Sequence, residues 1–101
     1  MTQTTLIIGK TIDSAQHKLD LIVGEFKYKT LQEVHKNRYL YRVRLKNGNK
    51  YIAVPGLENA IRGIRFDKAL LEVGLDKKLI QECILPFILN PSNIEYWKAY
   101  E

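Results

Sequence analysis

The chain has 101 residues, enough for one folded domain and too few for two independent cores. Its 46% hydrophobic and 27% charged content is that of an ordinary globular protein and argues against a wholly disordered chain. The net charge is +5, and the stretch from Lys27 to Val54 carries all of the excess, with eight Lys and Arg residues against a single acid, Glu33. A focused basic segment attracts polyanions and acidic partners.

Cysteine use and apolar runs bound the class of protein further. Cys83 is the only cysteine, so no disulfide can form within the chain and a cysteine-based zinc site is not expected. A lone cysteine fits a reducing compartment, and we expect a cytoplasmic protein. The longest apolar run, 84–89, has six residues and includes a proline, too short for a membrane span, so we expect no membrane partner.

The first elements in chain order are a strand and a helix. Leu6–Ile8 predicts a short buried strand, and Asp13 with a glutamine three residues later is typical of a helix start. Apolar residues recur at helical spacing over residues 14–23, and Gly24 is the expected left-handed stop. The last five of those residues also alternate as a strand would. Helix is the preferred interpretation of 14–23, with strand as the open alternative.

Three strands in an antiparallel meander are expected next. Alternation predicts the first over residues 25–31, followed by a polar loop at 32–37. The clearest strand runs from 39 to 45, where the odd positions are Tyr, Tyr, Val and Leu and the even positions from 38 to 46 are basic except for Leu40. Asn47-Gly48 suits a two-residue type I′ turn, because both residues tolerate positive φ.

That turn would fix the register of the hairpin. It places Val43 opposite Ile52 on an apolar face, and Arg44 opposite Tyr51 on the other face. The meander therefore has a predicted apolar inner face and a basic outer face that includes Tyr51.

The second half of the chain is predicted to be helical. Apolar spacing gives a helix after Leu57, and Asp67 and Asp76 are expected to cap two more helices. Ser92–Glu95 has the pattern of a capping box that opens a last short helix. Residues 67–85 also have the spacing of a helix-turn-helix, although bulky and acidic residues stand where that motif prefers small or basic ones.

The expected fold class follows from these elements. We expect an α+β protein with a single domain over residues 1–101, of which 1–56 are mainly sheet with one helix and 57–101 are helical. The sheet would have three to four antiparallel strands, with a meander whose hairpin turns at Asn47-Gly48. Short C-terminal helices would pack on one face and leave the other in water.

The basic outer face of the meander is the leading candidate site. Arg and Lys neutralise phosphates, Arg can also fork onto a guanine edge, and a neighbouring Tyr can stack on an unpaired base. The predicted nucleic-acid-binding residues are Lys27, Lys29, Arg38, Arg42, Arg44, Lys46 and Tyr51. The alternative without a function is a solvated sheet face on which basic residues discourage edge pairing.

No set of residues predicts a reaction. His17 and His35 lack acids at a metal-binding spacing, and Cys83 lies on an apolar stripe, as a core thiol would. Gly9-Lys10-Thr11 has only the last three letters of a phosphate-binding loop. We expect a protein that is not an enzyme and that carries no metal and no cofactor.

The expected function is that of a small accessory protein that binds DNA or RNA, as a possible component of a larger assembly. The alternative is a protein–protein interaction module, such as a small subunit, adaptor or inhibitor. Its basic face would dock on an acidic protein, or its aromatic C-terminus, with Tyr96, Trp97 and Tyr100, would dock on an apolar one. The sequence does not choose among DNA, RNA and protein.

Overall fold

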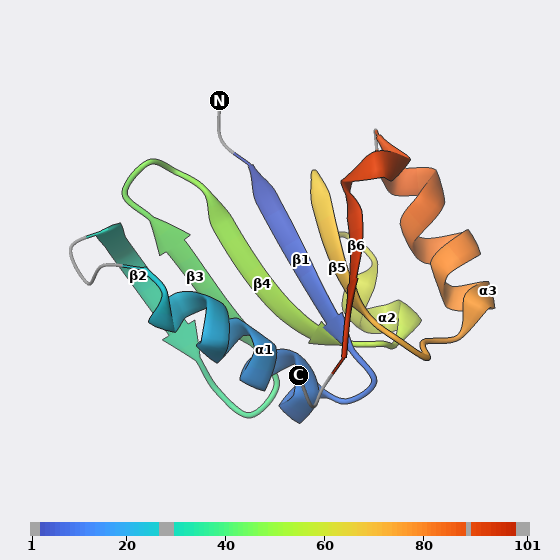
Figure 1. Ribbon diagram of the computed structural model, residues 1–101, viewed down its shortest axis with the longest axis horizontal. Coiled ribbons are helices and arrows are strands. Elements are labelled where there is room, and N and C mark those ends of the chain that lie inside the picture. Colours follow the sequence, from blue (N-terminus) through green and yellow to red (C-terminus); the bar gives the residue numbers. More distant parts are fainter. Residues whose placement is uncertain (1–2, 27–29, 89, 99–101) are drawn as a thin grey trace.

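The structure is a computed structural model that describes residues 3–26, 30–88 and 90–98. Its centre is a six-stranded sheet with the spatial order β2-β3-β4-β1-β5-β6 (Figure 1). The strands are β1 Thr4–Gly9, β2 Leu31–Lys36, β3 Tyr41–Leu45, β4 Lys50–Pro55, β5 Lys68–Glu72 and β6 Ile94–Trp97. β1 pairs in parallel with both β4 and β5, and β5 pairs in parallel with β6. β2, β3 and β4 form an antiparallel meander.

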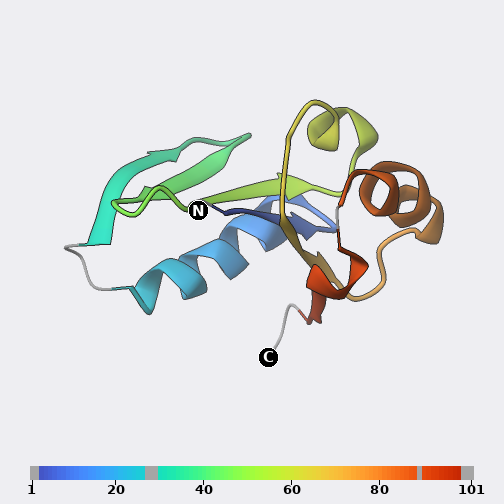
Figure 2. The ribbon, with the colours of Figure 1, turned by 90° about the horizontal axis from the view of Figure 1, so that it is seen from above.

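Helices cover the two faces of this sheet at different places. α1 (Ile12–Gly24) lies along one side of the meander, and α2 (Glu58–Ile61) lies on the other side (Figure 2). On the α2 side, α3 (Lys77–Leu79) continues into a π-helical turn, 80–84, and a 3₁₀ turn, 85–87. We call residues 77–87 the C-terminal helical segment. A further 3₁₀ turn, Pro91–Asn93, leads into β6. No helix in the described part of the chain is long and apolar enough to cross a membrane.

Two apolar cores follow from the alternation of β1. Ile7 packs with Ala15 and Leu19 of α1, while its neighbours Leu6 and Ile8 pack on the opposite side with α2 and the C-terminal helical segment. All three β1 side chains are fully buried. An uninterrupted apolar run is what a central parallel strand requires, because both of its faces are covered. The predicted strand at Leu6–Ile8 is confirmed.

The helix over residues 14–23 is also confirmed, with different ends. Thr11, rather than Asp13, is the N-cap, and its Oγ1 accepts a hydrogen bond of 3.1 Å from the Ser14 N–H. Asp13 lies in the first turn, where a carboxylate is favoured by the helix dipole. Gly24 is the last helical residue, and its φ is not positive.

The predicted helix after Leu57 and the helix capped by Asp76 are confirmed as α2 and α3, but the prediction that residues 57–101 are helical throughout is wrong, because β5 and β6 lie there. Asp67 caps no helix. Its carboxylate accepts a hydrogen bond from the Thr4 N–H (2.9 Å), and its own N–H donates to the Thr4 carbonyl (2.8 Å), at the start of the β1–β5 pairing. Since 68–72 is a strand, the helix-turn-helix of residues 67–85 does not form. The residues expected to open the last helix instead complete the 3₁₀ turn and begin β6.

The N-terminal half of the meander is shifted along the chain. The predicted polar loop at 32–37 is mostly β2, and Phe26 follows the end of α1 rather than beginning a strand. Residues 27–29 of the predicted first strand lie outside the described residues. β2 is an edge strand with mostly exposed side chains, which explains why its sequence resembles a loop.

The hairpin after β3 is confirmed, but its register differs by one residue. Arg44 pairs with Lys50 and Val43 with Tyr51, so the loop spans residues 46–48 and Gly48 has a φ of 95°. This is the three-residue loop with a left-handed glycine rather than the two-residue turn. A shift of one residue reverses the faces of β4 relative to β3.

The expected α+β class with an antiparallel sheet is corrected to an α/β-type fold. The sheet is mixed, because it contains the predicted antiparallel meander together with the parallel pairs of β1 with β4 and β5 and of β5 with β6.

Candidate nucleic-acid interface

On the α2 side of the sheet, no helix lies over β2 and β3 (Figure 2). Tyr41 and Val43 of β3 point toward α1 and are buried in the core on that side. By alternation, Arg42 and Arg44 point to the opposite side, where Figure 2 shows no helix over β2 and β3. We call this area the uncovered face and define it by the charged and polar outward residues of the three strands, which are Glu33, His35, Arg42, Arg44 and Lys50. Ile52, opposite Arg42, points to the same side and packs against the core on the α2 side.

The cations of the uncovered face are held at fixed spacings by the strands. Arg42 and Arg44 are two residues apart on β3, about 7 Å along the strand. Lys50 of β4 lies opposite Arg44, at roughly 5 Å between Cβ atoms. Arg44 Nη2 forms an ion pair of 3.2 Å with Glu33 Oε2, and both side chains remain exposed, at 42% and 50%. His35 lies opposite Arg42. The face therefore carries three cations and one carboxylate.

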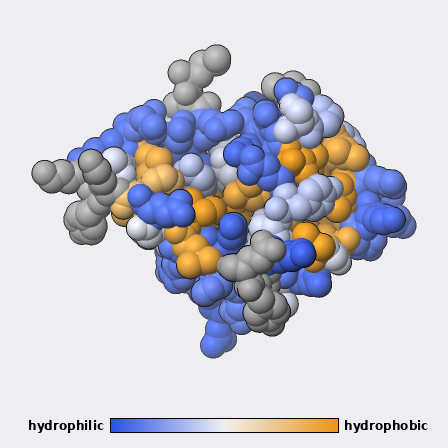
Figure 3. Space-filling model, in the orientation of Figure 1, coloured by the Kyte–Doolittle hydropathy of each residue, from blue (hydrophilic) through white to orange (hydrophobic). Residues whose placement is uncertain are grey.

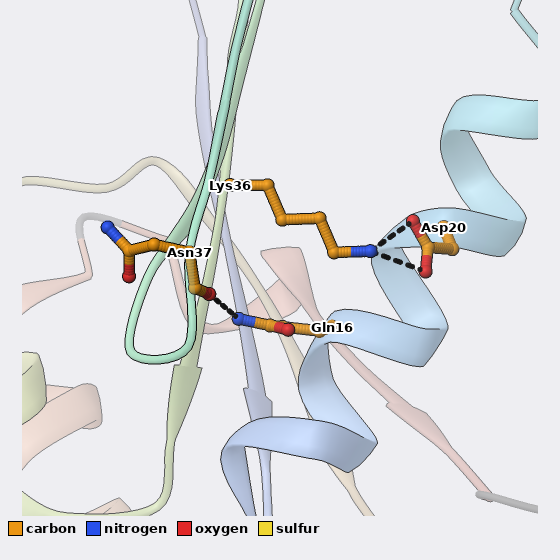
Figure 4. A network of polar contacts seen from close by, with 4 residues as sticks. All are labelled: Gln16, Asp20, Lys36 and Asn37. Atoms are coloured by element: carbon orange, nitrogen blue, oxygen red, sulfur yellow. Dashed lines mark hydrogen bonds and ion pairs between the residues drawn. The ribbon is translucent and has the colours of Figure 1, made fainter.

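Lys36 belongs to the other side of the meander. Its Nζ lies 3.1 Å from Asp20 Oδ2 of α1 (Figure 4). The same Nζ lies 4.7 Å from the centre of the Tyr41 ring. In the same place the Gln16 side chain donates a hydrogen bond of 2.8 Å to the Asn37 carbonyl. Burial raises the pKa of Tyr41 to about 12, with further contributions from its hydrogen bond to Asp20 and from the charge of that carboxylate. These contacts attach the β2–β3 connection to α1.

The α1 side differs from the uncovered face in the character of its surface. Figure 3 shows apolar residues at the surface over α1 and the meander, and again beside β6 and α3. Val34 of β2 is half exposed on this side, and Leu21 of α1 is exposed to a similar degree. On the opposite side, the outward residues of β2, β3 and β4 are instead mostly charged, with His35 and the partly buried Ile52 as the exceptions.

The structure brings together some of the predicted binding residues and separates others. Arg42 and Arg44 lie side by side on the uncovered face. Arg38 lies in the β2–β3 connection and Lys46 in the β3–β4 loop, so they lie beyond opposite ends of β3, and both are exposed. Lys27 and Lys29 lie outside the described residues.

The predicted outward position of Tyr51 is wrong. Its ring packs against Phe26 on the α1 side, with 5.5 Å between ring centres. Lys50 and His35 were not predicted, yet both belong to the uncovered face. The sequence held no separate signal for Lys50, because Asn47-Gly48 also suits a two-residue turn; in the structure, the left-handed Gly48 ends a three-residue loop and sets the register that places Lys50 outward.

Gly9-Lys10-Thr11 does lie between β1 and α1, but a side chain of the protein occupies the start of the helix. Glu72, which is 6% exposed, accepts hydrogen bonds from the Lys10 N–H (2.7 Å) and the Ser14 hydroxyl (2.9 Å) through Oε1. A carboxylate from β5 thus takes the place in which a phosphate-binding loop holds its anion. The hydrogen bonds of Glu72 with Lys10 and Ser14 therefore connect β5 to the start of α1.

A cavity of about 500 Å³ lies between the α2–β5 connection and the C-terminal helical segment. Its apolar wall includes Phe66, Cys83 and Phe87, and an ion pair between Glu58 and Arg62 lies at its rim. Such a volume is that of a ligand pocket, but its charges are balanced and favour no class of ligand. Among the described residues, no group of three His, Cys, Asp or Glu side chains could hold a metal ion.

Of the C-terminal aromatic residues, Trp97 is buried against the α1 side core and Tyr96 is 61% exposed. Tyr100 lies outside the described residues. The comparisons with known proteins do not choose among these surfaces, since no family model, no curated protein and no solved structure matches the chain.

Proposed function

We propose that the protein binds nucleic acid through the uncovered face, as a non-catalytic accessory protein. One observation carries the proposal. The alternation of β3 directs Arg42 and Arg44 to the α2 side of the sheet, where no helix lies over β2 and β3, and the register of β4 adds Lys50 beside them. Because the strands are paired on both sides of β3, the cations are placed before a ligand arrives, which lowers the entropic cost of binding.

The size of the patch sets the expected strength and salt dependence. If three cations each neutralise one phosphate, the logarithm of the affinity falls with the logarithm of salt with a slope of about −2.7 on duplex DNA. Affinity should then drop by roughly 40-fold between 50 and 200 mM salt. Binding of this kind is weak and independent of sequence, and suits a subunit that adds nucleic-acid contact to a larger assembly.

The first test removes the two arginines. We expect Arg42→Gln/Arg44→Gln to weaken binding to a labelled 20-base-pair duplex at least tenfold at 50 mM salt, as measured by fluorescence anisotropy. The control is Lys77→Gln/Lys78→Gln, which removes the same charge from the exposed start of α3. Far-UV circular dichroism would verify that both variants fold. Equal losses in the two variants would show that only net charge matters and would reject the uncovered face as the site.

A second test has the opposite sign. Glu33→Gln removes the carboxylate that forms the ion pair with Arg44, so a phosphate no longer competes with it. We expect affinity to rise severalfold, while Glu95→Gln, which breaks an exposed ion pair with Lys68 on the α1 side, should have little effect. Unchanged or weaker binding of Glu33→Gln would contradict the proposed role of Arg44.

We propose protein interaction as the second candidate function, and the edge strand β6 supports it. β6 pairs with β5, and its other edge has no partner strand among the described residues. Tyr96 is exposed on this strand, so a partner could add a strand and pack on the tyrosine. A partner that co-purifies in stoichiometric amount after nuclease treatment, and is lost with Tyr96→Ala, would favour this function. Retention of such a partner by that variant would remove β6 as its site.

A further inference from the structure

The uncovered face lacks the side chains on which unpaired bases stack. Among the described residues, its outward side chains include no Phe, Tyr or Trp, and His35 is its single ring. Proteins that hold single strands use several aromatic rings in a basic groove, and each base–aromatic stack contributes about 1–3 kcal/mol. Tyr51 was the residue predicted to stack on a base, but the register of the hairpin directs it to the opposite side of the sheet, where it packs on Phe26.

The exposed aromatic residues elsewhere lie apart from this face. Tyr96 belongs to β6, four strands from β3, which is about 19 Å at the usual strand spacing. Phe87 lines the cavity beside the C-terminal helical segment. Tyr39 is 75% exposed but lies in the β2–β3 connection, beyond the end of β3. One ring at the end of the face cannot hold a row of successive bases.

The charges of the face match a rigid row of phosphates. The Cα atoms of Arg42 and Arg44 lie about 7 Å apart along the strand, so their side chains leave the sheet at a spacing that suits successive phosphates, and Lys50 extends the row sideways to β4. A duplex already holds its phosphates in place and has the higher charge density, one charge per roughly 1.7 Å of axis. A flexible single strand must be ordered on binding, and the described outward side chains of the uncovered face offer no Phe, Tyr or Trp whose stacking would offset this cost.

We infer that the uncovered face binds nucleic-acid duplexes through their phosphates, and that it discriminates against single strands of the same length. The inference rests on the proposed function and names the class of nucleic acid that the site takes. The chemistry is that of the phosphodiester backbone of a duplex, which DNA and RNA share, so the face distinguishes the two only through the shape of the helix.

The experiment compares labelled 20-mers by fluorescence anisotropy at 50 mM salt: a DNA duplex, an RNA duplex, and a single strand of each. We expect at least one duplex to bind about tenfold or more tightly than its own single strand. The Arg42→Gln/Arg44→Gln variant should lose that preference. Single strands that bind as tightly as the duplexes, or more tightly, would overturn the inference and leave the proposed function standing. Absence of binding to all four probes would reject the proposed function and the inference with it.

A second variant examines Tyr39, the exposed tyrosine in the connection that leads into β3. Tyr39→Ser should leave both the affinity and the duplex preference unchanged, because phosphate contacts do not need the ring. A selective loss of single-strand affinity in this variant would show that stacking contributes and would count against the inference. The residue is exposed in a connection whose backbone is held by the Asn37 side chain, so the substitution should not disturb folding.

Discussion

Replacing Glu72 by alanine would remove the contact that joins β5 to the start of α1. The carboxylate is buried, and its Oε1 accepts hydrogen bonds from the backbone N–H of Lys10 and from the hydroxyl of Ser14. Both donors belong to the segment that leaves β1 and begins the helix. The substitution would leave them without an acceptor at a place where water has poor access.

The expected loss follows from the two hydrogen bonds. A bond to a charged group contributes about 1.5–3 kcal/mol, and the lower value suits two bonds that share one acceptor atom, which gives about 3 kcal/mol for Glu72→Ala. That is a large part of the 5–15 kcal/mol by which a domain is usually stable. At about 4 °C or more per kcal/mol for a domain of this size, Tm should fall by at least roughly 12 °C. Glu72→Gln keeps an acceptor atom and should lose only about 1 kcal/mol.

Urea unfolding followed by circular dichroism would measure these losses. Glu95→Ala is the matched control, because it removes an exposed glutamate from the neighbouring strand together with a surface ion pair, and should lose less than about 1 kcal/mol. Ser14→Ala combined with Glu72→Ala completes a double-mutant cycle, in which a coupling of about 1 kcal/mol is expected. A loss for Glu72→Ala as small as that of Glu95→Ala, or zero coupling, would refute the role given to this contact.

Three further predictions concern stability and need only unfolding curves. Gly24→Ala should raise the free energy of unfolding by about 0.5–1 kcal/mol, because an added Cβ has no neighbour within 4 Å and alanine favours the helix. Gly9→Ala should lower it by about 2 kcal/mol or more, since the Cβ would lie 2.7 Å from the Ala15 backbone nitrogen; a neutral result would mean that this turn can move. Tyr41 holds its proton more tightly in the folded state, with its pKa raised from 10.0 to about 12, so wild-type stability should fall as pH rises from 10 to 12. Tyr41 should contribute at most about 3 kcal/mol to this fall, so the fall should be smaller in Tyr41→Phe, and equal slopes in the two proteins would contradict the prediction.

The elements that could be predicted from the sequence are those whose signal is local. The buried strand at Leu6–Ile8, the helix over 14–23 and the hairpin near Asn47-Gly48 depend on neighbouring residues and turn chemistry. β5 depends on a distant partner instead. Its sequence, Lys68–Glu72, is equally suited to a helix, and it becomes a strand because β1 offers an open edge to pair with. Tertiary pairing overrides local preference in such segments.

Part of the candidate site could be predicted, because the positions of its arginines also depend only on a local pattern. Arg42 and Arg44 alternate with buried residues on one strand, so their shared face needs no knowledge of the partner strand. The side of the sheet to which Lys50 and Tyr51 point depends on whether the loop has two residues or three, and the dipeptide Asn-Gly suits both forms. Only the backbone of the structure shows that Gly48 alone adopts a positive φ in this loop. The resulting shift of the register by one residue places Lys50, instead of Tyr51, opposite Arg44 on the uncovered face.

The central place of β1 has a consequence for the order of folding. The strand comes early in the chain, yet its two neighbours follow much later, as the hydrogen bonds from Gln3 to Asn49 and from Thr4 to Asp67 show, with separations of 46 and 63 residues. Closing such long loops costs entropy before any pairing is gained, and slows folding. During synthesis, the apolar run of β1 must therefore remain unpaired until β4 has emerged, and half paired until β5 has. The nascent chain should be most prone to aggregate, and to need a chaperone, in that interval.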